Sequence, residues 1–232
     1  MMSAVLSNPN HPEYGVATIP FPIPRDQYTY CMDLLEALEI GDAVKADCKV
    51  EKIDSFYTVL KRTEMLTVNA EELNYLAKRL DSFDTGEAAQ FQAMAHKLEL
   101  FELKDLINLT FCCQQATVIT DFSDLAAIGR DHYMNLHGGS ASVDELNALD
   151  DKGTARQLIE SGSGTVTPYG VVYDNGMKLE QVYDDRFFPC YYYKPNVITV
   201  AVTSKSEPED TNHITWLILP MVQEAVSYTH LR

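Results

Sequence analysis

The sequence predicts an α+β fold in an elongated chain, with a small N-terminal α+β module, a central helical module and a C-terminal β-rich module. Three observations support this prediction. Apolar residues recur at helical spacing through the middle of the chain, aromatic and β-branched runs separated by turn residues dominate after residue 164, and the first 66 residues mix both patterns. With 232 residues, of which 46% are hydrophobic, the chain can bury a core of ordinary size.

The module boundaries are predicted where these patterns change. The N-terminal module covers 1–66, the helical module 67–136, and the β-rich module, which opens with a helix, 137–225. The last residues, 226–232, resemble translated sequencing-adapter readthrough and are expected to be a non-native tail. The first ten residues hold neither a basic nor an apolar segment, so we expect a cytoplasmic protein without a secretory signal.

The N-terminal module is expected to begin with a short strand-like run within residues 14–24. Three prolines in this segment exclude a central strand or a helix, because proline lacks the N–H that both structures use. A helix is expected to follow, from about Asp26 to Ile40. Residues 48–60 carry apolar side chains at every third position from Val50, so strand and helix both stay open there.

Apolar spacing predicts four helices in the central module. The first follows Asn69, a suitable N-cap, with Glu71 and Glu72 in its first turn. Gly86 is expected to separate it from the second, at about 87–98. The residues expected to face inward are Leu73, Leu76, Ala77 and Leu80 of the first helix and Phe91, Met94, Ala95 and Leu98 of the second.

The third and fourth helices of this module are predicted from shorter runs of helically spaced apolar residues. The third is expected at 103–111, and the fourth from about Asp121 to Tyr133, with Asp121 and Asp124 in its first turn. Short connections between the four helices are typical of a helical module.

The C-terminal module changes from helix to strand. Ser142 and Glu145 form a capping-box pattern for a helix, which ends in the flexible connector 161–164. Asp174-Asn175-Gly176 is expected to turn a β-hairpin, because Asn-Gly suits the positive φ angles of such turns. The expected strands are 165–173, 177–183, 187–193, 197–203 and 215–219.

Charge is the strongest global signal of the sequence. Asp and Glu number 34 against 18 Lys and Arg, giving a net charge of −16, and the excess is spread along the whole chain. Such a protein repels nucleic acid and anionic membranes and attracts basic surfaces. Since duplex DNA carries one charge per roughly 1.7 Å, sixteen charges on one face would match roughly 27 Å of duplex. The other interpretation is that the acids serve solubility alone.

Signatures of catalysis and of cofactor binding are missing. The sequence holds no Gly-rich nucleotide loop, Walker lysine, nucleophile elbow or zinc-protease helix, so we expect no enzyme, no catalytic residues and no cofactor. Asp131, His132 and His137 are too few for a zinc site, and no metal is expected. The five cysteines are expected to be reduced and mostly buried, which leaves a cysteine hydrolase using Cys112 or Cys113 as a minor alternative.

Four segments of the chain resemble the antirestriction protein ArdA family of clostridial mobile genetic elements. They are 71–77 (Glu-Glu-Leu-Asn-Tyr-Leu-Ala), 104–109 (Lys-Asp-Leu-Ile-Asn-Leu), 121–125 (Asp-Phe-Ser-Asp-Leu) and 129–133 (Gly-Arg-Asp-His-Tyr). The resemblance covers mainly residues 14–136. The sequence departs from the family in its proline-rich opening, 19–24, and in the β-rich extension, about 165–220.

The resemblance implies a non-catalytic, acidic inhibitor that mimics DNA, acts as a homodimer and occupies the basic DNA-binding groove of a type I restriction–modification complex. The departures leave the target open, so a CRISPR nuclease is an alternative partner. Another alternative is a mobile-element protein that binds a different partner through its tyrosine-rich extension. The acids expected to form the partner-binding surface are Glu71, Glu72, Asp81, Asp84, Glu87, Asp121, Asp124 and Asp131.

Overall fold

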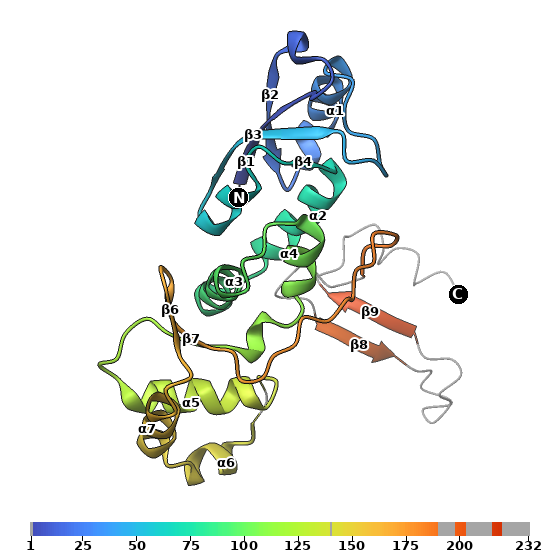
Figure 1. The fold of residues 1–232 in the computed structure, drawn as a ribbon. Coiled ribbons are helices and arrows are strands. Elements are labelled where there is room, and N and C mark those ends of the chain that lie inside the picture. The colour runs from blue at the N-terminus through green and yellow to red at the C-terminus, as the bar shows by residue number, and fades with distance from the viewer. Residues whose placement is uncertain (1, 140, 190–197, 203–214, 220–232) are drawn as a thin grey trace. The chain divides into compact units, whose positions relative to one another are not determined.

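The computed structural model describes residues 2–139, 141–189, 198–202 and 215–219 (Figure 1). Helices and antiparallel sheets both contribute, which confirms the α+β class. The chain divides into two compact units, 1–189 and 190–232. The three-module division stays a prediction.

The N-terminal sheet has the strand order β2-β1-β3-β4, with every neighbouring pair antiparallel. Its strands are β1 (Met2–Ser7), β2 (Val16–Phe21), β3 (Cys48–Ser55) and β4 (Thr67–Val68). Strand β2 holds Pro20 at the edge of the sheet, which confirms that the prolines exclude a central strand. Helix α1 (Tyr28–Ala37) follows and buries Cys31 and Leu35.

A β-bulge explains why the spacing of apolar residues in 48–60 did not distinguish a strand from a helix. Val5 of β1 lies opposite Lys52, but Leu6 lies opposite Val50, so Glu51 is an extra residue in β3. Buried side chains therefore step by two from Cys48 to Val50 and by three to Ile53. A 3₁₀ helix, η3 (Thr58–Thr63), continues the apolar pattern with Val59 and Leu60.

Three helices follow: α2 (Ala70–Asp81), α3 (Thr85–Lys97) and α4 (Leu103–Leu109). Asn69 caps α2 by accepting hydrogen bonds from the backbone N–H groups of Glu71 and Glu72, as predicted. The expected role of Gly86 is wrong, since Asp84 is the N-cap of α3 and Gly86 lies in its first turn. The expected inward position of Leu98 is also wrong, because the helix ends there and Leu98 is 40% exposed.

A second, three-stranded antiparallel sheet has the order β5-β7-β6. Its strands are β5 (Thr117–Ile119), β6 (Thr165–Thr167) and β7 (Gly170–Tyr173). The sequence analysis missed β5, which lies inside the predicted helical module and pairs with β7 across the predicted boundary at residue 136.

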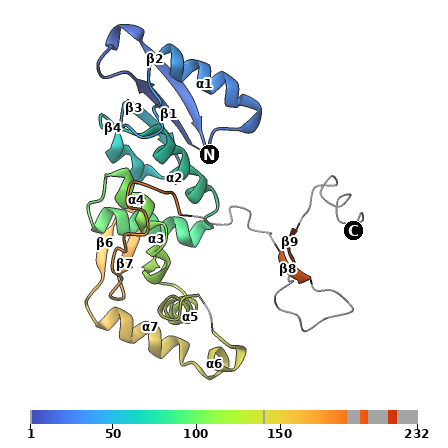
Figure 2. The same cartoon turned by 90° about the vertical axis from the view of Figure 1, so that its right-hand side faces the viewer.

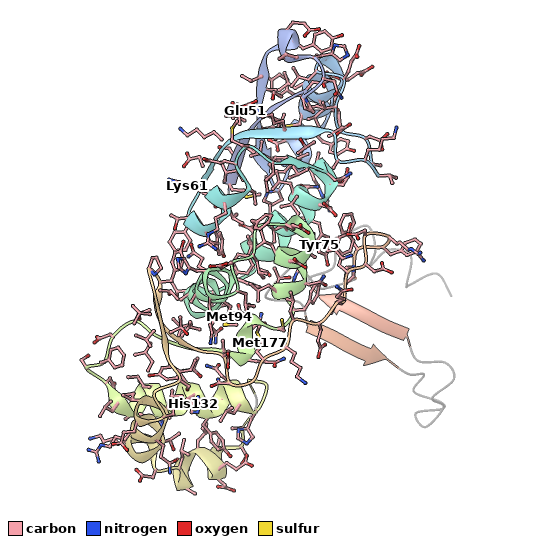
Figure 3. The ribbon with its side chains drawn as sticks, viewed as in Figure 1. Glu51, Lys61, Tyr75, Met94, His132 and Met177 are labelled. Atoms are coloured by element: carbon pink, nitrogen blue, oxygen red, sulfur yellow. The ribbon has the colours of Figure 1, made fainter. Side chains whose placement is uncertain are left out.

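Helices lie on both faces of this sheet (Figures 1 and 2). On one face is α3, where Figure 3 labels the buried Met94. On the other are α5 (Leu125–Leu136), where Figure 3 labels His132, and α7 (Asp151–Glu160). Ile119 and Tyr173 of the sheet form a core with Ile128 and Leu158 of these two helices. Between them, α6 (Val143–Ala148) carries the predicted capping box of Ser142 and Glu145.

The hairpin expected at Asp174-Asn175-Gly176 is wrong, although a turn does lie there. Asn175 and Gly176 have φ angles of 54° and 77°, as the Asn-Gly signal requires. However, the Asn175 amide donates to Gln115 O and Thr117 Oγ1, so the turn braces β5, and 177–183 form no strand. The hairpin instead joins β6 to β7 through Pro168 and Tyr169.

Segment 177–189 is fixed to the helices by a buried amide. Asn108 of α4 donates to Tyr183 O (3.0 Å) and accepts from Tyr183 N (2.7 Å). Phe188 then stacks between Tyr183 and Tyr75, at centroid distances of 5.0 and 4.6 Å. No strand forms at 187–189, which corrects the first part of the strand expected at 187–193.

The second unit contains β8 (Ile198–Val202) and β9 (Thr215–Leu219), which pair antiparallel and confirm the strands expected there. Residues 190–193, which include the tyrosine run, and the expected non-native tail, 226–232, lie outside the described residues.

Close contact between α5 and α7 requires a glycine. A Cβ atom at Gly129 would lie 1.8 Å from the carbonyl oxygen of Asp151, so no larger residue fits without moving a helix. We therefore expect Gly129→Ala to lower the free energy of unfolding by about 1–3 kcal/mol, the usual cost of overpacking. Thermal unfolding followed by circular dichroism would measure the loss.

Ala127→Ser is the matched control, because Ala127 is exposed on the same helix. Its effect should stay within about 0.5 kcal/mol, as for most surface substitutions. If Gly129→Ala proved as harmless as the control, the described packing of α5 on α7 would be incorrect.

Candidate functional site

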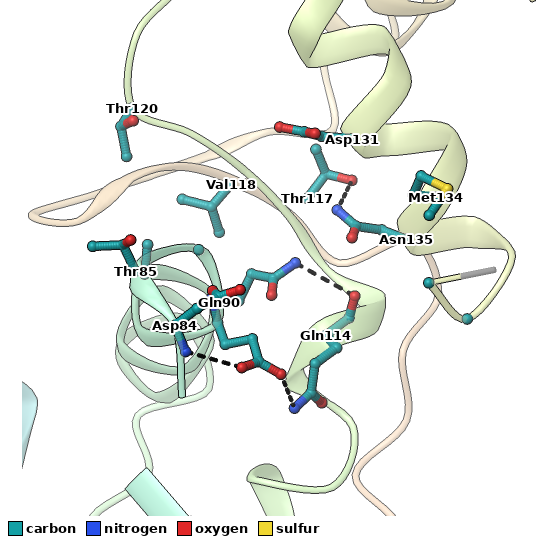
Figure 4. A pocket seen from close by; sticks show the side chains of 15 residues that line it. Asp84, Thr85, Gln90, Gln114, Thr117, Val118, Thr120, Asp131, Met134 and Asn135 are labelled. Carbon is teal, nitrogen blue, oxygen red and sulfur yellow. Dashed lines mark hydrogen bonds between the residues drawn. The ribbon is translucent and has the colours of Figure 1, made fainter. Parts of the chain in front are cut away.

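A groove of about 750 Å³ runs along the outer edge of β5 (Figure 4). One wall is the N-terminal half of α3, and the other is the C-terminal half of α5 with the turn that follows it. The lining residues are Asp84, Thr85, Gly86, Glu87, Ala89, Gln90, Gln114, Thr117, Val118, Thr120, Asp131, Met134, Asn135, Gly138 and Gly139.

A smaller hollow of about 190 Å³ adjoins the groove and shares Asp131 and the β5 residues Thr117 and Val118 with it. The groove and the hollow together bring five of the eight acids predicted to bind a partner around one strand. Neither Lys nor Arg occurs among the described residues that line them. The acids concerned are Asp84 and Glu87 in the groove, Asp121 and Asp124 in the hollow, and Asp131 in both.

Helix caps hold three of these carboxylates in place. Asp84 accepts from the Glu87 backbone N–H (2.9 Å) while Glu87 accepts from the Asp84 backbone N–H (3.0 Å). Asp124 caps α5 through the N–H groups of Ala126 and Ala127, both at 3.0 Å. These hydrogen bonds fix the direction of the three carboxylates, and the helix N-terminus is a favourable place for negative charge.

Asp121 is held differently, and its expected position in a first helical turn is wrong. The helix begins only at Leu125, after its N-cap Asp124, so Asp121 lies in the preceding loop. There it accepts from the backbone N–H and the hydroxyl of Ser123, both at 2.8 Å. These hydrogen bonds lower the pKa of the Asp121 carboxyl and keep it charged.

Asp131 has the least favourable setting of the five acids. It projects from the middle of α5 towards β5 (Figure 4). Although the residue as a whole is exposed, partial burial of its carboxyl raises the pKa above the ordinary Asp value. Asp131 therefore carries its negative charge at neutral pH at some cost to the fold.

The other three predicted acids lie away from β5. Glu71 is exposed in the first turn of α2, and Asp81 ends that helix beside Tyr57. Glu72 is half-buried and accepts from the Tyr183 hydroxyl at 3.0 Å. Burial raises the pKa of Glu72 despite this hydrogen bond, so its charge is less available to a partner than that of an exposed acid.

The sequence analysis missed the polar residues that complete the groove. Gln90 donates to Ala116 O at 2.7 Å. The amide of Gln114 donates to Glu87 at 3.3 Å (Figure 4). Asn135 donates to Thr117 Oγ1 at 3.3 Å. The run of four β-branched residues at 117–120 (Thr-Val-Ile-Thr) was the signal of a strand that would have located them.

The histidines near Asp131 have structural roles. His132 Nδ1 lies 2.9 Å from Thr117 Oγ1, and burial lowers the pKa of its ring. His137 stacks on Tyr133 and its Nδ1 lies 2.7 Å from the Tyr133 carbonyl. Within the described part of the chain, no three side chains that could ligate a metal come together.

The cysteines are buried, as predicted, at the four positions that the structure describes. Burial raises the pKa of the Cys112 thiol and raises that of Cys113 further. Since only the thiolate attacks, both are poor nucleophiles. Cys190 lies outside the described residues.

Comparisons with known proteins do not place the chain in a family. No family model matches it, and neither a curated protein nor a solved structure does. The resemblance to the ArdA family therefore stays a prediction. Among the helices of the described residues, none has the length and apolar character needed to cross a membrane.

Asp131→Asn tests the cost of the buried charge. Because the folded state raises the Asp131 pKa, it retains a proton that the unfolded chain has already lost, so this group lowers stability as pH rises through its folded pKa. The quantity to compare is the free energy of unfolding of the Asn variant minus that of the parent. We expect this difference to be more positive at pH 7 than at pH 4. Thermal unfolding at both pH values measures this change, and a difference that does not vary with pH would contradict it.

Proposed function

We propose that this protein is an acidic inhibitor that mimics DNA and occupies the basic DNA-binding surface of a nuclease defence complex. The partner of first choice is a type I restriction–modification complex, and a CRISPR nuclease is the alternative. The observation that carries the proposal is the gathering of five carboxylates around β5 with no Lys or Arg in the lining. A cationic partner surface is the chemical complement of this groove.

The number of carboxylates around β5 indicates what length of DNA duplex the groove alone could imitate. At one charge per roughly 1.7 Å of duplex, five carboxylates match about 8.5 Å, which is less than one helical turn. Neighbouring acids must therefore contribute. Residues 121–160 contain eight acids and three bases, and Asp144, Glu145 and Asp150 among them are exposed. These three acids lie on α6 and at the start of α7, and we propose that they add to the mimic surface.

Mimicry of this kind depends on many weak contacts. An exposed ion pair contributes roughly 0.2–1 kcal/mol, so no single acid should be essential. Salt also weakens such contacts, because the screening length falls to about 8 Å at physiological ionic strength. Loss of inhibition on raising salt is therefore expected from the proposal, in contrast to inhibition through a buried apolar interface.

Four isosteric changes test the proposal: Asp84→Asn, Glu87→Gln, Asp124→Asn and Asp131→Asn combined in one protein. Asn and Gln keep the helix caps while removing four negative charges. We expect the affinity for the target complex to fall about 30-fold at 0.05 M salt, by summing roughly 0.5 kcal/mol for each pair. Inhibition of DNA cleavage by a purified type I complex, repeated with a CRISPR nuclease, is the measurement.

The control removes the same number of charges elsewhere, at Asp26→Asn, Asp33→Asn, Glu36→Gln and Asp54→Asn. All four are exposed acids outside the groove and the hollow. This control should change affinity by less than threefold, with circular dichroism confirming that both proteins are folded. If the two sets of substitutions weakened inhibition equally, inhibition would depend on net charge and not on the groove. If the groove set had no effect, the proposal would be refuted.

A further inference from the structure

The outer edge of β5 is open to the groove. In the order β5-β7-β6, strand β5 pairs with β7 on one side only, and no other strand of the described chain lies on its second side. Backbone groups of successive residues in an antiparallel strand point to alternate sides. Strand β5 therefore presents N–H and C=O groups to the groove as well as to β7.

Two other edge strands of the described sheets hold or adjoin a proline. Edge β2 holds Pro20, and edge β6 is followed at once by Pro168. Proline and lysine on an edge strand are among the usual means of preventing a further strand from pairing. Residues 117–120, which comprise β5 and Thr120, include neither proline nor lysine, and carboxylates line the groove beside them.

We propose that this groove takes an extended, Lys- or Arg-rich segment of the partner, which adds to β5 as a fourth strand of the sheet. The cationic character of that segment rests on the proposed function, while strand addition rests on the open edge. Main-chain hydrogen bonds to β5 supply affinity in this mode of binding, and side-chain contacts supply specificity. A second copy of this chain is not the favoured occupant, because its own β5 edge brings the same carboxylates and like charges repel.

The arrangement of the walls specifies the sequence that fits. Side chains of an added strand alternate between the two faces of the sheet. On one face they meet Asp84 and Glu87 of α3, and on the other they meet Asp131 of α5. Consecutive basic residues therefore find carboxylates on both faces, whereas alternating basic and apolar residues would use only one.

The length of the edge sets the length of the segment. Residues 117–120 border the groove or the hollow, and at about 3.3 Å per residue they span roughly 13 Å. About four residues of a partner strand can pair along this edge. A run of about four consecutive Lys or Arg residues is thus the chemical class of ligand that the groove selects.

The test uses the full chain and a capped eight-residue peptide with four consecutive basic residues at its centre. A second peptide has the same sequence with N-methyl groups on the four basic residues, which keeps every charge but removes the main-chain donors. We expect the first peptide to bind at 0.05 M salt and the methylated one to bind at least about tenfold more weakly. Equal binding of the two, or no binding of the first, overturns strand addition.

Hydrogen exchange locates the contact. Binding of the first peptide should slow exchange within 117–120, because a backbone N–H of β5 becomes hydrogen-bonded, and the methylated peptide should not. The variant with Asp84→Asn, Glu87→Gln and Asp131→Asn should bind the first peptide at least about tenfold more weakly than the parent does. Exchange unchanged at 117–120 in the presence of a saturating peptide would also overturn the proposal.

Failure of this inference is distinguishable from failure of the proposed function. If the groove variants lose nuclease inhibition but the peptide fails to bind, strand addition is wrong and DNA mimicry stands. If the peptide binds and protects 117–120 while the groove variants inhibit the nuclease as the parent does, strand addition is correct and its partner is a basic protein other than the nuclease.

Discussion

The pairing of β5 with β7 is the constraint on which the candidate site depends. It joins residues 117–119 to 171–173, and the Asn175 amide reinforces it through hydrogen bonds to Gln115 O (2.7 Å) and Thr117 Oγ1 (2.9 Å). This pairing holds a strand between α3 on one face and α5 on the other. Without it, the five carboxylates would belong to separate helix ends and loops, and no groove would bring them together.

The electrostatics of the groove follow from where the nearby cations are used. Lys97 of α3 pairs with Asp174 at 2.7 Å, and Arg130 of α5 pairs with Asp151 at 2.8 Å. Both acidic partners lie outside the lining of the groove. The Lys of α3 and the Arg of α5 thus bind acids elsewhere, and the charged side chains of the lining are carboxylates. Helix caps hold Asp84, Glu87 and Asp124 in position, so their charge remains available to a partner.

The sequence predicted those features that depend on residues close together in the chain, such as helix caps and the edge position of a strand. The caps at Asn69 and Ser142 were predictable because an N-cap is chosen by residues within one turn. The edge position of β2 followed from proline alone. Long-range pairing was not predictable in this way. The bulge at Glu51 interrupts the alternation of buried residues by which a strand is recognised. The Asn-Gly turn was predicted correctly, but the strand expected after it was not, because Asn175 bonds to a segment sixty residues earlier.

The candidate site shows the same division between local and long-range information. The sequence analysis grouped Glu72 with the acids on helix ends. Only the fold shows that burial raises the pKa of Glu72, although the Tyr183 hydroxyl donates to it. Burial raises the pKa of Asp131 as well. Unlike Glu72, however, Asp131 lines the groove. Selection for stability alone would favour Asn at that position. A cationic ligand would offset the desolvation of the charge, so an Asp at position 131 suits the proposed binding role better than it suits the stability of the isolated fold.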